Sequence, residues 1–495
     1  MFISIYDFCS ILSEIYMLIC INFLLVYGVL FSTSLKKGYP NISLNLAWLC
    51  IQVSLISILI LFFSSDFDIF IWNQLLTYNF FIYGIKLILL VSFIVWVLLS
   101  LFYATYEKLN SFEYWVLSLL AVVSMIFIVK SCDLLSMYLS IECQSLILYI
   151  LASFKRTSEF STESGLKYFI LGAFSSALLL FGSSILYGLT GLTGFDDYMK
   201  LFSGLLLGDT VLNSGIIFGS LVICISLLFK ISSAPFHVWS PDVYEGAPTS
   251  STLFFSILPK LSILVLFLRF CFLGFQDFFY SWQKIIFFCT YLSIFVGTFG
   301  AFAQNKWKRF LAYSSINHVG FILLGFSTGE LESIFSVIFY VLVYIILTFG
   351  VFAFLISLRY FYFPVHYQIR YIKDLISLFE INSTLTFSLT LLLFSMAGIP
   401  PLLGFFSKVF VLLIALQSNL YSLSFFSVIM SCITCFYYIR LIKLMYFDKT
   451  QSLMVTYPLN KLNSMLLSLF TVLSSFLFLD LELLLIFSTH ISLLF

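Results

Sequence analysis

Apolar runs of about 20 residues, the length that crosses a membrane as a helix, follow one another along the whole chain with only short polar breaks. They show no alternation of polar and apolar residues, and they are about twice as long as the strands of a membrane barrel. Only 9% of the residues are charged and 62% are hydrophobic, which leaves too few polar side chains to cover a water-soluble fold. We therefore predict an all-α polytopic membrane protein without a soluble domain.

The sequence predicts fourteen membrane-spanning helices. With the N-terminus outside, most of the 24 Lys and Arg residues fall in inner loops, as the positive-inside rule requires. Lys130, Lys200, Arg269 and Lys284 are expected on the outer side. The predicted spans are 12–31, 42–63, 80–103, 112–129, 134–154, 165–189, 211–240, 249–272, 282–303, 310–327, 334–357, 376–416, 420–445 and 465–487.

The seventh and twelfth spans are too long for one straight crossing. Pro235 lies inside the seventh, and Pro400 and Pro401 lie inside the twelfth. Because proline breaks a helix interior, we interpret both as broken helices, whose freed backbone groups can hold ions. Their separation by five spans predicts two inverted five-helix repeats, helices 4–8 and 9–13. The predicted division of the chain is 1–110 for helices 1–3, 111–275 and 276–450 for the two repeats, and 451–495 for helix 14.

Four ionisable residues lie near the middle of predicted spans: Glu142, Lys230, Lys260 and Lys408. Each costs at least about 2.5 to 3.5 kcal/mol near the bilayer centre and should face the protein interior. For any one of them, an ion pair that only fixes helix packing is the alternative. Four in one chain favour proton transfer, because burial can neutralise a lysine and a nearby carboxylate can restore its charge.

Two further lysines lie near the ends of their predicted spans, Lys86 and Lys167. We expect their ammonium groups to reach the interface; Lys167 is kept as a weaker candidate for proton transfer.

Other features exclude several classes of site. The ten cysteines are scattered, and there is no Gly-rich phosphate loop, so we expect no metal and no cofactor bound by this chain. Asp7 and Glu14 stand where a presequence would be basic, so no cleavage is expected. We expect the chain to be surrounded by lipid and to bind no nucleic acid.

Several motifs resemble one family. The stretch FKISSAPFHVWSPDVYEGAPT, residues 229–249, is followed by SSTLFFSILPKLSI, which contains Lys260. It resembles the signature of the antiporter-like membrane subunits of NADH:ubiquinone oxidoreductase (respiratory complex I), and the YEGAPT ending with Lys260 resembles the subunit 2 branch. Sister subunits usually carry a histidine in the eighth span. Further matches are YLSIE (138–142), GLKYF (165–169), KRFLAYSSINH (308–318) and GIPPLLGFFSK (398–408).

The resemblance implies roles for individual residues in proton translocation. Glu142 and Lys230 would form a charge pair, Lys260 the central relay and Lys408 the far end of the array. His237 and His318 are weaker relay candidates. The resemblance implies that the chain moves protons as a subunit of an H⁺-translocating NADH:ubiquinone reductase. The redox centres would lie elsewhere: NADH, flavin, iron–sulfur clusters and ubiquinone are expected in other subunits.

The same resemblance implies the partners and the location. We expect a subunit 4 type antiporter-like neighbour, other membrane-arm subunits including small ones, and lipid. The mitochondrial inner membrane is the expected location, with the N-terminus on the intermembrane-space side. Two alternatives stay open: a subunit of a multisubunit cation/proton antiporter, and a membrane scaffold whose ion pairs are inert.

Overall fold

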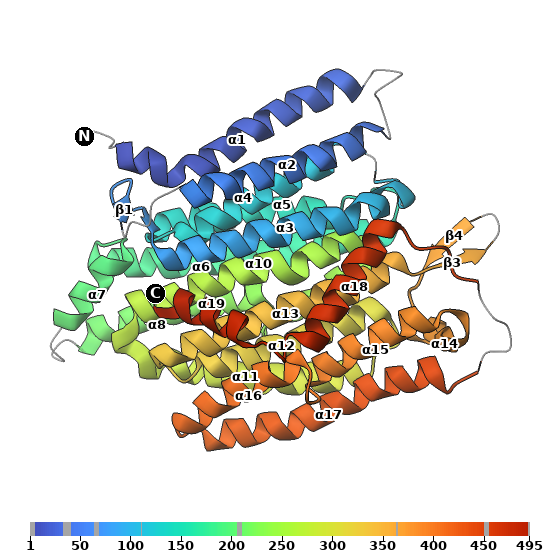
Figure 1. Cartoon of the computed structure of the whole chain (residues 1–495). Coiled ribbons are helices and arrows are strands. Elements are labelled where there is room, and N and C mark those ends of the chain that lie inside the picture. Colours follow the sequence, from blue (N-terminus) through green and yellow to red (C-terminus); the bar gives the residue numbers. More distant parts are fainter. Residues whose placement is uncertain are drawn as a thin grey trace. The chain divides into compact units, whose positions relative to one another are not determined.

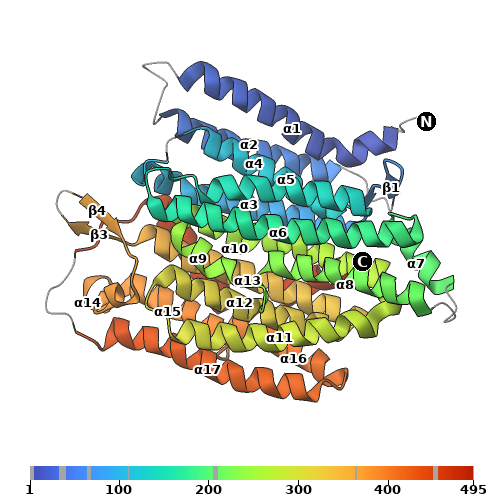
Figure 2. The same cartoon turned by 180° about the vertical axis from the view of Figure 1, so that it is seen from behind.

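A computed structural model shows a helical chain (Figures 1 and 2). It describes residues 5–32, 41–63, 69–109, 111–204, 210–362, 365–449 and 455–493. The chain divides into two compact units: Met1–Ile231 with Gly246–Ile285 and Leu493–Phe495, and Ser232–Glu245 with Ile286–Ser492.

The first unit contains most of the N-terminal half. Long apolar runs form its helices, and a short antiparallel hairpin, β1 and β2, precedes the third of them. Its elements are α1 (Ile5–Ser32), α2 (Asn41–Phe63), β1 (Ile69–Ile71), β2 (Leu76–Tyr78), α3 (Phe80–Tyr106), α4 (Glu113–Lys130), α5 (Leu134–Ala152), α6 (Glu159–Thr190), α7 (Phe195–Gly204), α8 (Thr210–Ile231), α10 (Thr249–Arg269), η1 (Phe270–Gly274) and η2 (Gln276–Phe278).

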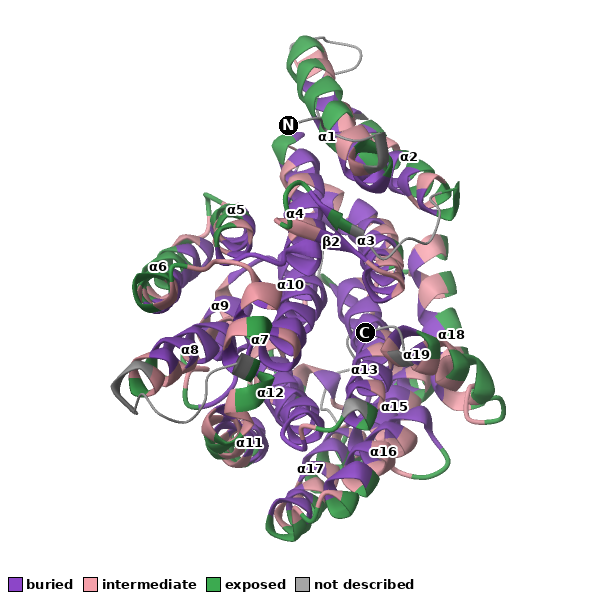
Figure 3. Ribbon diagram, turned by 90° about the vertical axis from the view of Figure 1, so that its left-hand side faces the viewer, coloured by how far each residue is buried: buried purple, intermediate pink, exposed green. Residues whose placement is uncertain are grey.

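Helix α10 is the core of the first unit. All of its residues are buried, and it packs against α3, α4, α5 and α8. Helices α1 and α6 instead keep many apolar side chains exposed, and Figure 3 shows this contrast. Large apolar side chains exposed on membrane-length helices are what lipid-facing surfaces require. The burial pattern therefore separates an interior helix, which carries Lys260, from helices that face lipid.

The second unit contains the remaining helices and a second short hairpin. Helix α11 starts in the first unit and continues into the second. The elements are α9 (Trp239–Gly246), α11 (Phe279–Phe302), α12 (Trp307–Phe326), α13 (Leu331–Ser357), β3 (Arg359–Tyr362), β4 (Val365–Gln368), η3 (Ile372–Leu375), α14 (Leu378–Ile381), α15 (Ser383–Ala397), α16 (Leu403–Gln417), α17 (Tyr421–Tyr446), α18 (Lys461–Phe476) and α19 (Glu482–Leu493).

Helix α13 holds the central position in the second unit. It packs against α12, α15, α16 and α18, and most of its residues are buried. Helix α17 packs against α15 and α16 and leaves many apolar side chains exposed. The two halves of the broken span, α15 and α16, thus both contact neighbours at the core of this unit.

Both predicted helix breaks are confirmed. Helix α8 ends at Ile231 and helix α9 begins at Trp239, with Pro235 between them. Helix α15 ends at Ala397 and α16 begins at Leu403, with both prolines in the gap. The peptide bonds preceding Pro235 and Pro401 are cis.

The predicted spans and the observed helices differ in detail. Eleven helices among the described residues are long and apolar enough to cross a membrane. The predicted spans 376–416 and 465–487 coincide with pairs of shorter apolar helices, and the predicted span 310–327 coincides with α12, which is not among the eleven. The prediction of one straight helix over 465–487 is wrong, because α18 ends at Phe476 and α19 begins at Glu482. Asp480 and Glu482 explain the interruption, since acidic groups are favoured beside a helix N-terminus rather than within an apolar helix.

Candidate functional site

Glu142 and Lys230 lie in the first unit on two helices that share a neighbour. Glu142 is in the middle of α5, Lys230 is the penultimate residue of α8, and α6 packs against both helices. Both side chains are partly buried. No ion pair joins them among the described residues, although the Glu142 carboxylate acts electrostatically on Lys230. The two groups therefore interact across a gap rather than through direct contact.

Polar atoms on α5 are available for further hydrogen bonds. Glu142 Oε1 is buried, and so are both amide atoms of Gln144, and none of them has a hydrogen-bond partner in the described part of the chain. Gln144 is 2% exposed. Buried polar atoms of this kind are normally satisfied by water or by a protonated group. Gln144 was missed by the sequence analysis, although a glutamine inside an apolar span is itself a signal.

Lys260 lies in the interior of the first unit. It is the twelfth residue of α10 and only 4% of its surface is exposed. Pro259 immediately precedes it inside the helix. Because proline has no N–H, the carbonyl one turn earlier, on Phe255, lacks its usual helical donor. The prediction that Lys260 points inward is confirmed.

Lys408 completes the end of a helix in the second unit. Its Nζ atom donates to the carbonyl oxygens of Ala397 at 2.7 Å and Met396 at 3.3 Å, the last two residues of α15. Gly398, with φ of +84°, donates its N–H to the two preceding carbonyls, those of Phe394 and Ser395. The four terminal carbonyls of α15 are thereby all satisfied. The break therefore places a buried lysine against the carbonyl end of a helix.

Two aromatic rings, those of Tyr340 and Phe321, lie between His318 and Lys408. His318 Nδ1 is 2.9 Å from the hydroxyl of Tyr340, and the histidine is 4% exposed. The ring of Tyr340 stacks on Phe321, and Lys408 Nζ lies 5.4 Å from the centre of the Phe321 ring. Two of the candidates therefore lie within the second unit with the stacked rings of Tyr340 and Phe321 between them.

The other two candidates lie in more open surroundings. His237 is partly buried, and its ring lies 6.4 Å from that of Tyr313. The side chain of Lys167 is 44% exposed and pairs with Glu163 at 2.8 Å, one turn earlier on α6. An exposed i,i+4 pair of this kind contributes little free energy. The Lys167 side chain is therefore exposed at the protein surface, and its position at the membrane interface stays a prediction.

Asp242 and Glu245 on α9 form ion pairs. Asp242 accepts from Arg309 at 3.2 Å, and Glu245 pairs with both Lys306 and Arg309. These contacts attach α9 to the start of α12 within the second unit. The two carboxylates therefore have a structural role, because their ion pairs with Lys306 and Arg309 join α9 to α12.

The expectation for Lys86 is wrong. Its side chain is fully buried and lies 2.7 Å from Glu14 Oε1, and Lys130 lies 2.7 Å from the same oxygen. Lys130 and Arg269, expected on the outer side, are buried as well. Glu14 is the tenth residue of α1, so an acidic residue inside an apolar run was the available signal. Pairing with Glu14 explains why Lys86 does not extend to the interface.

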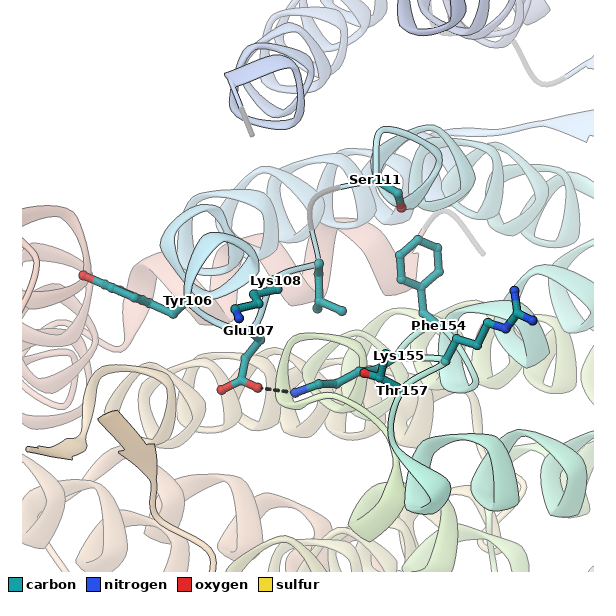
Figure 4. Close-up of a pocket in the computed structure, with 9 residues that line it drawn as sticks. Tyr106, Glu107, Lys108, Ser111, Phe154, Lys155 and Thr157 are labelled. Atoms are coloured by element: carbon teal, nitrogen blue, oxygen red, sulfur yellow. Dashed lines mark hydrogen bonds and ion pairs between the residues drawn. The ribbon is translucent and has the colours of Figure 1, made fainter. Parts of the chain in front are cut away.

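A pocket of about 400 Å³ lies among loop residues of the first unit, at the ends of α3 and α5 (Figure 4). Lys155 points toward Glu107 across it, and the two form an ion pair at 2.6 Å. Lys108, Ser111 and Phe154 also line it. The pocket contains none of the candidate proton-transfer residues. Among the described residues, no group of three or more His, Cys, Asp or Glu could hold a metal ion.

The arrangement is suited to moving protons. The carboxylate of Glu142 and the ammonium groups of Lys230, Lys260 and Lys408 lie on membrane-length or broken helices, and each group exists in a charged and a neutral form. In a low-dielectric interior, a change in one charge alters the proton affinity of its neighbours. The described groups can therefore bind and release protons in response to charge changes.

Comparisons with known proteins point to one family. Residues 131–434 match the model of the NADH:quinone oxidoreductase/Mrp antiporter transmembrane family. The chain is 44% identical to NADH-ubiquinone oxidoreductase chain 2 of Marchantia polymorpha, with 96% of each chain covered. It is 41% identical to the protein of the same name from Arabidopsis thaliana, covering 93% of this chain and 91% of the relative. For NADH-quinone oxidoreductase subunit N of Pelagibacter ubique the identity is 39%, with 89% of each covered.

Solved structures share the fold. A chain of respiratory complex I from Thermus thermophilus with bound aureothin has a TM-score of 0.77 and 24% identity, covering 96% of this chain and 98% of its own. A chain of the archaeal membrane-bound sulfane sulfur reductase has a TM-score of 0.82 and 21% identity, covering 98% of this chain and 96% of its own. A chain of the Mrp complex from Dietzia sp. DQ12-45-1b has a TM-score of 0.79 and 16% identity, covering 99% of this chain and 97% of its own. At these identities the likeness concerns the fold alone.

Proposed function

The chain belongs to the NADH:quinone oxidoreductase/Mrp antiporter transmembrane family, and from this premise we propose that it is the proton-translocating subunit 2 of the membrane arm of NADH:ubiquinone oxidoreductase. Relatives that match nearly the whole chain are named NADH-ubiquinone oxidoreductase chain 2, and they support the proposal. The reaction is catalysed by the whole complex. This chain contributes proton movement, and NADH, flavin, iron–sulfur clusters and ubiquinone are assigned to other subunits.

The observation that carries the proposal is the buried lysine at a broken helix. Lys408 donates to the final carbonyls of α15, so the break supplies a polar site for a proton-carrying group inside an apolar bundle. Lys260 supplies a second buried ammonium at the centre of α10. Neither lysine lies where its charge would be solvated, so each is a group whose protonation can be changed by neighbouring charges.

In the proposed mechanism, redox work elsewhere in the complex changes the charge state at Glu142 and Lys230. Withdrawal of the Glu142 charge lowers the proton affinity of Lys230, because a buried cation without compensation is costly. The protonation states of Lys260 and Lys408 then change in turn. His318, linked to Lys408 through Tyr340 and Phe321, belongs to the same array in this proposal.

The finer topology is part of the proposal. We assign fourteen spans, with helices 4–8 and 9–13 as inverted repeats, and chain segments 1–110, 111–275, 276–450 and 451–495. The location is the mitochondrial inner membrane with the N-terminus in the intermembrane space. The partners are a subunit 4 type antiporter-like subunit, small membrane subunits and lipid.

Purification of the tagged chain from membranes solubilised in mild detergent tests the proposal. The expected preparation contains flavin and iron–sulfur signals and reduces a quinone with NADH. A preparation without redox centres that exchanges Na⁺ for H⁺ would instead identify a subunit of a cation/proton antiporter, a function consistent with the fold shared with the Mrp complex. A chain with neither property would contradict both assignments.

A further inference from the structure

Glu14, Lys86 and Lys130 form a buried ionic cluster between α1, α3 and α4. Both ammonium groups lie 2.7 Å from Glu14 Oε1, and all three side chains are 0% exposed. Lys86 also donates to Ser13 Oγ at 2.7 Å, and the Ser13 hydroxyl donates to Glu14 Oε2 at 2.8 Å. Lys130 donates to the carbonyl oxygen of Ser10 at 2.8 Å. Hydrogen bonds through Ser13 therefore connect Lys86 to Glu14, and ion pairs at Oε1 hold both lysines against the same carboxylate.

Among the described residues, no carboxylate other than Glu14 forms an ion pair with Lys86 or Lys130. The ring of Tyr78 lies 5.8 Å from Lys86 Nζ and 5.2 Å from Lys130 Nζ. Arg269 donates to Thr77 Oγ1 at 2.5 Å, and Thr77 in turn donates to the carbonyl of Lys130 at 3.3 Å. Arg269 brings a further cation near the cluster, and the carboxylate of Asp196 acts electrostatically on that arginine.

The carboxylates closest in sequence to this region have other contacts. Asp7, three residues before Ser10 on α1, accepts a long hydrogen bond from the backbone N–H of Trp72. Asp133, which follows the end of α4, caps the start of α5 through the N–H of Leu135. Among the described residues, Glu14 is the carboxylate that ion-pairs with Lys86 and Lys130.

The cluster contains an odd number of ionisable groups. With all three charged it carries one excess positive charge, and a fully buried excess charge is costly. Loss of one proton from a lysine leaves a balanced pair. A purely structural ion pair would need only one lysine, so the second lysine adds cost to a structural cluster without adding a new carboxylate contact.

Lys86 is the lysine better suited to lose the proton. Lys130 is the last residue of α4, where the helix dipole favours a cation, and it donates to a carbonyl. Lys86 lies within the first two turns of α3, at the end where the dipole opposes a cation. Its neighbour Ser13 can accept a proton from Lys86 and pass its own proton to Glu14.

We propose that Glu14, Lys86 and Lys130 form a second proton-binding site, separate from the Glu142, Lys230, Lys260 and Lys408 array, and that it takes up and releases one proton during turnover. The inference rests on the proposed function. In the loaded state both lysines are protonated and Glu14 is ionised. A proton moves from Lys86 through Ser13 to Glu14, and Glu14 then releases it to water. The emptied state contains neutral Lys86 beside the Glu14 and Lys130 ion pair.

The test uses the assembled complex in membrane vesicles. Lys86→Met imitates the neutral lysine and leaves the Glu14 and Lys130 pair balanced, so normal assembly is expected. Proton pumping driven by NADH should fall by about tenfold, which corresponds to roughly 1.4 kcal/mol. Lys130→Met should give the same defect, because Lys86 must then stay protonated to balance Glu14 and can no longer lose its proton. Lys200→Met, which removes an exposed lysine on α7, is the matched control and should pump normally.

Glu142→Gln is measured in parallel so that the two proposals fail separately. Normal pumping by Lys86→Met, together with a defect in Glu142→Gln, would overturn the second site alone. Normal pumping by both variants would remove the proposed function and the second site with it. Lys86→Gln keeps a hydrogen-bonding end group; if neither this variant nor Lys86→Met assembles, a neutral residue 86 is not tolerated and the inference is wrong.

Discussion

The Nζ atom of Lys408 lies 2.7 Å from the carbonyl oxygen of Ala397, the residue at which α15 ends. The helix end presents partial negative charge, which favours a cation. The contact also satisfies a carbonyl that has no partner within its own helix. One side chain thus stabilises the broken helix and places a titratable group inside the bundle.

Replacing Lys408 with methionine should separate these two roles. We expect the complex to assemble, because the lost hydrogen bonds are offset by removal of a buried charge. Proton pumping should fall by about tenfold, equivalent to roughly 1.4 kcal/mol. Quenching of a pH-sensitive dye in vesicles measures this, with Lys443→Met on the exposed face of α17 as control. Equal pumping by the two variants would show that Lys408 has only a structural role.

Gly404 is expected to tolerate no side chain. A Cβ there would lie 1.8 Å from the carbonyl oxygen of Ser395, a backbone atom that cannot move aside alone. Gly404→Ala should therefore separate α16 from α15 and reduce the amount of assembled complex on a native gel. Gly188→Ala is the control, because nothing lies within 4 Å of its Cβ position and alanine favours a helix by roughly 1 kcal/mol. Normal assembly of Gly404→Ala would contradict the observed packing.

The charge on Lys260 is expected to change during turnover. Lys260 is buried at the centre of α10, and arginine at this position would keep its charge because guanidinium does not deprotonate. Lys260→Arg should therefore damage pumping nearly as much as Lys260→Ala. Pumping rates per assembled complex provide the comparison. If Lys260→Arg pumps normally while Lys260→Ala does not, only the positive charge matters and the relay role is wrong.

Glu142 and Lys230 should act as an electrostatic couple. They interact without a direct ion pair, so neither should be needed for assembly. Glu142→Gln and Lys230→Met are each expected to lower NADH:quinone activity and proton pumping together. Glu163→Gln, which removes the exposed partner of Lys167, is the matched control and should leave both unchanged. Full coupled turnover in an assembled Glu142→Gln complex would refute the assignment.

Much of the helical layout was predictable from the sequence. Membrane crossing requires a minimum apolar length, and this requirement is local, so the apolar runs coincide with helices. The two breaks were equally local, because proline removes an N–H wherever it stands within a helix. The inward direction of Lys260 followed from its depth alone, since its stem cannot reach either interface from the middle of a span.

The tertiary structure decided which charged groups meet. Lys86 and Lys167 looked alike in sequence, each a few residues inside an apolar span, yet Lys86 is fully buried against Glu14 and Lys167 is exposed beside Glu163. Sequence position gives the depth of a residue along a helix. Which face of that helix meets protein rather than lipid depends on packing against helices distant in sequence. The carbonyl partners of Lys408 likewise required the folded chain, because they lie across the helix break that the sequence could only locate.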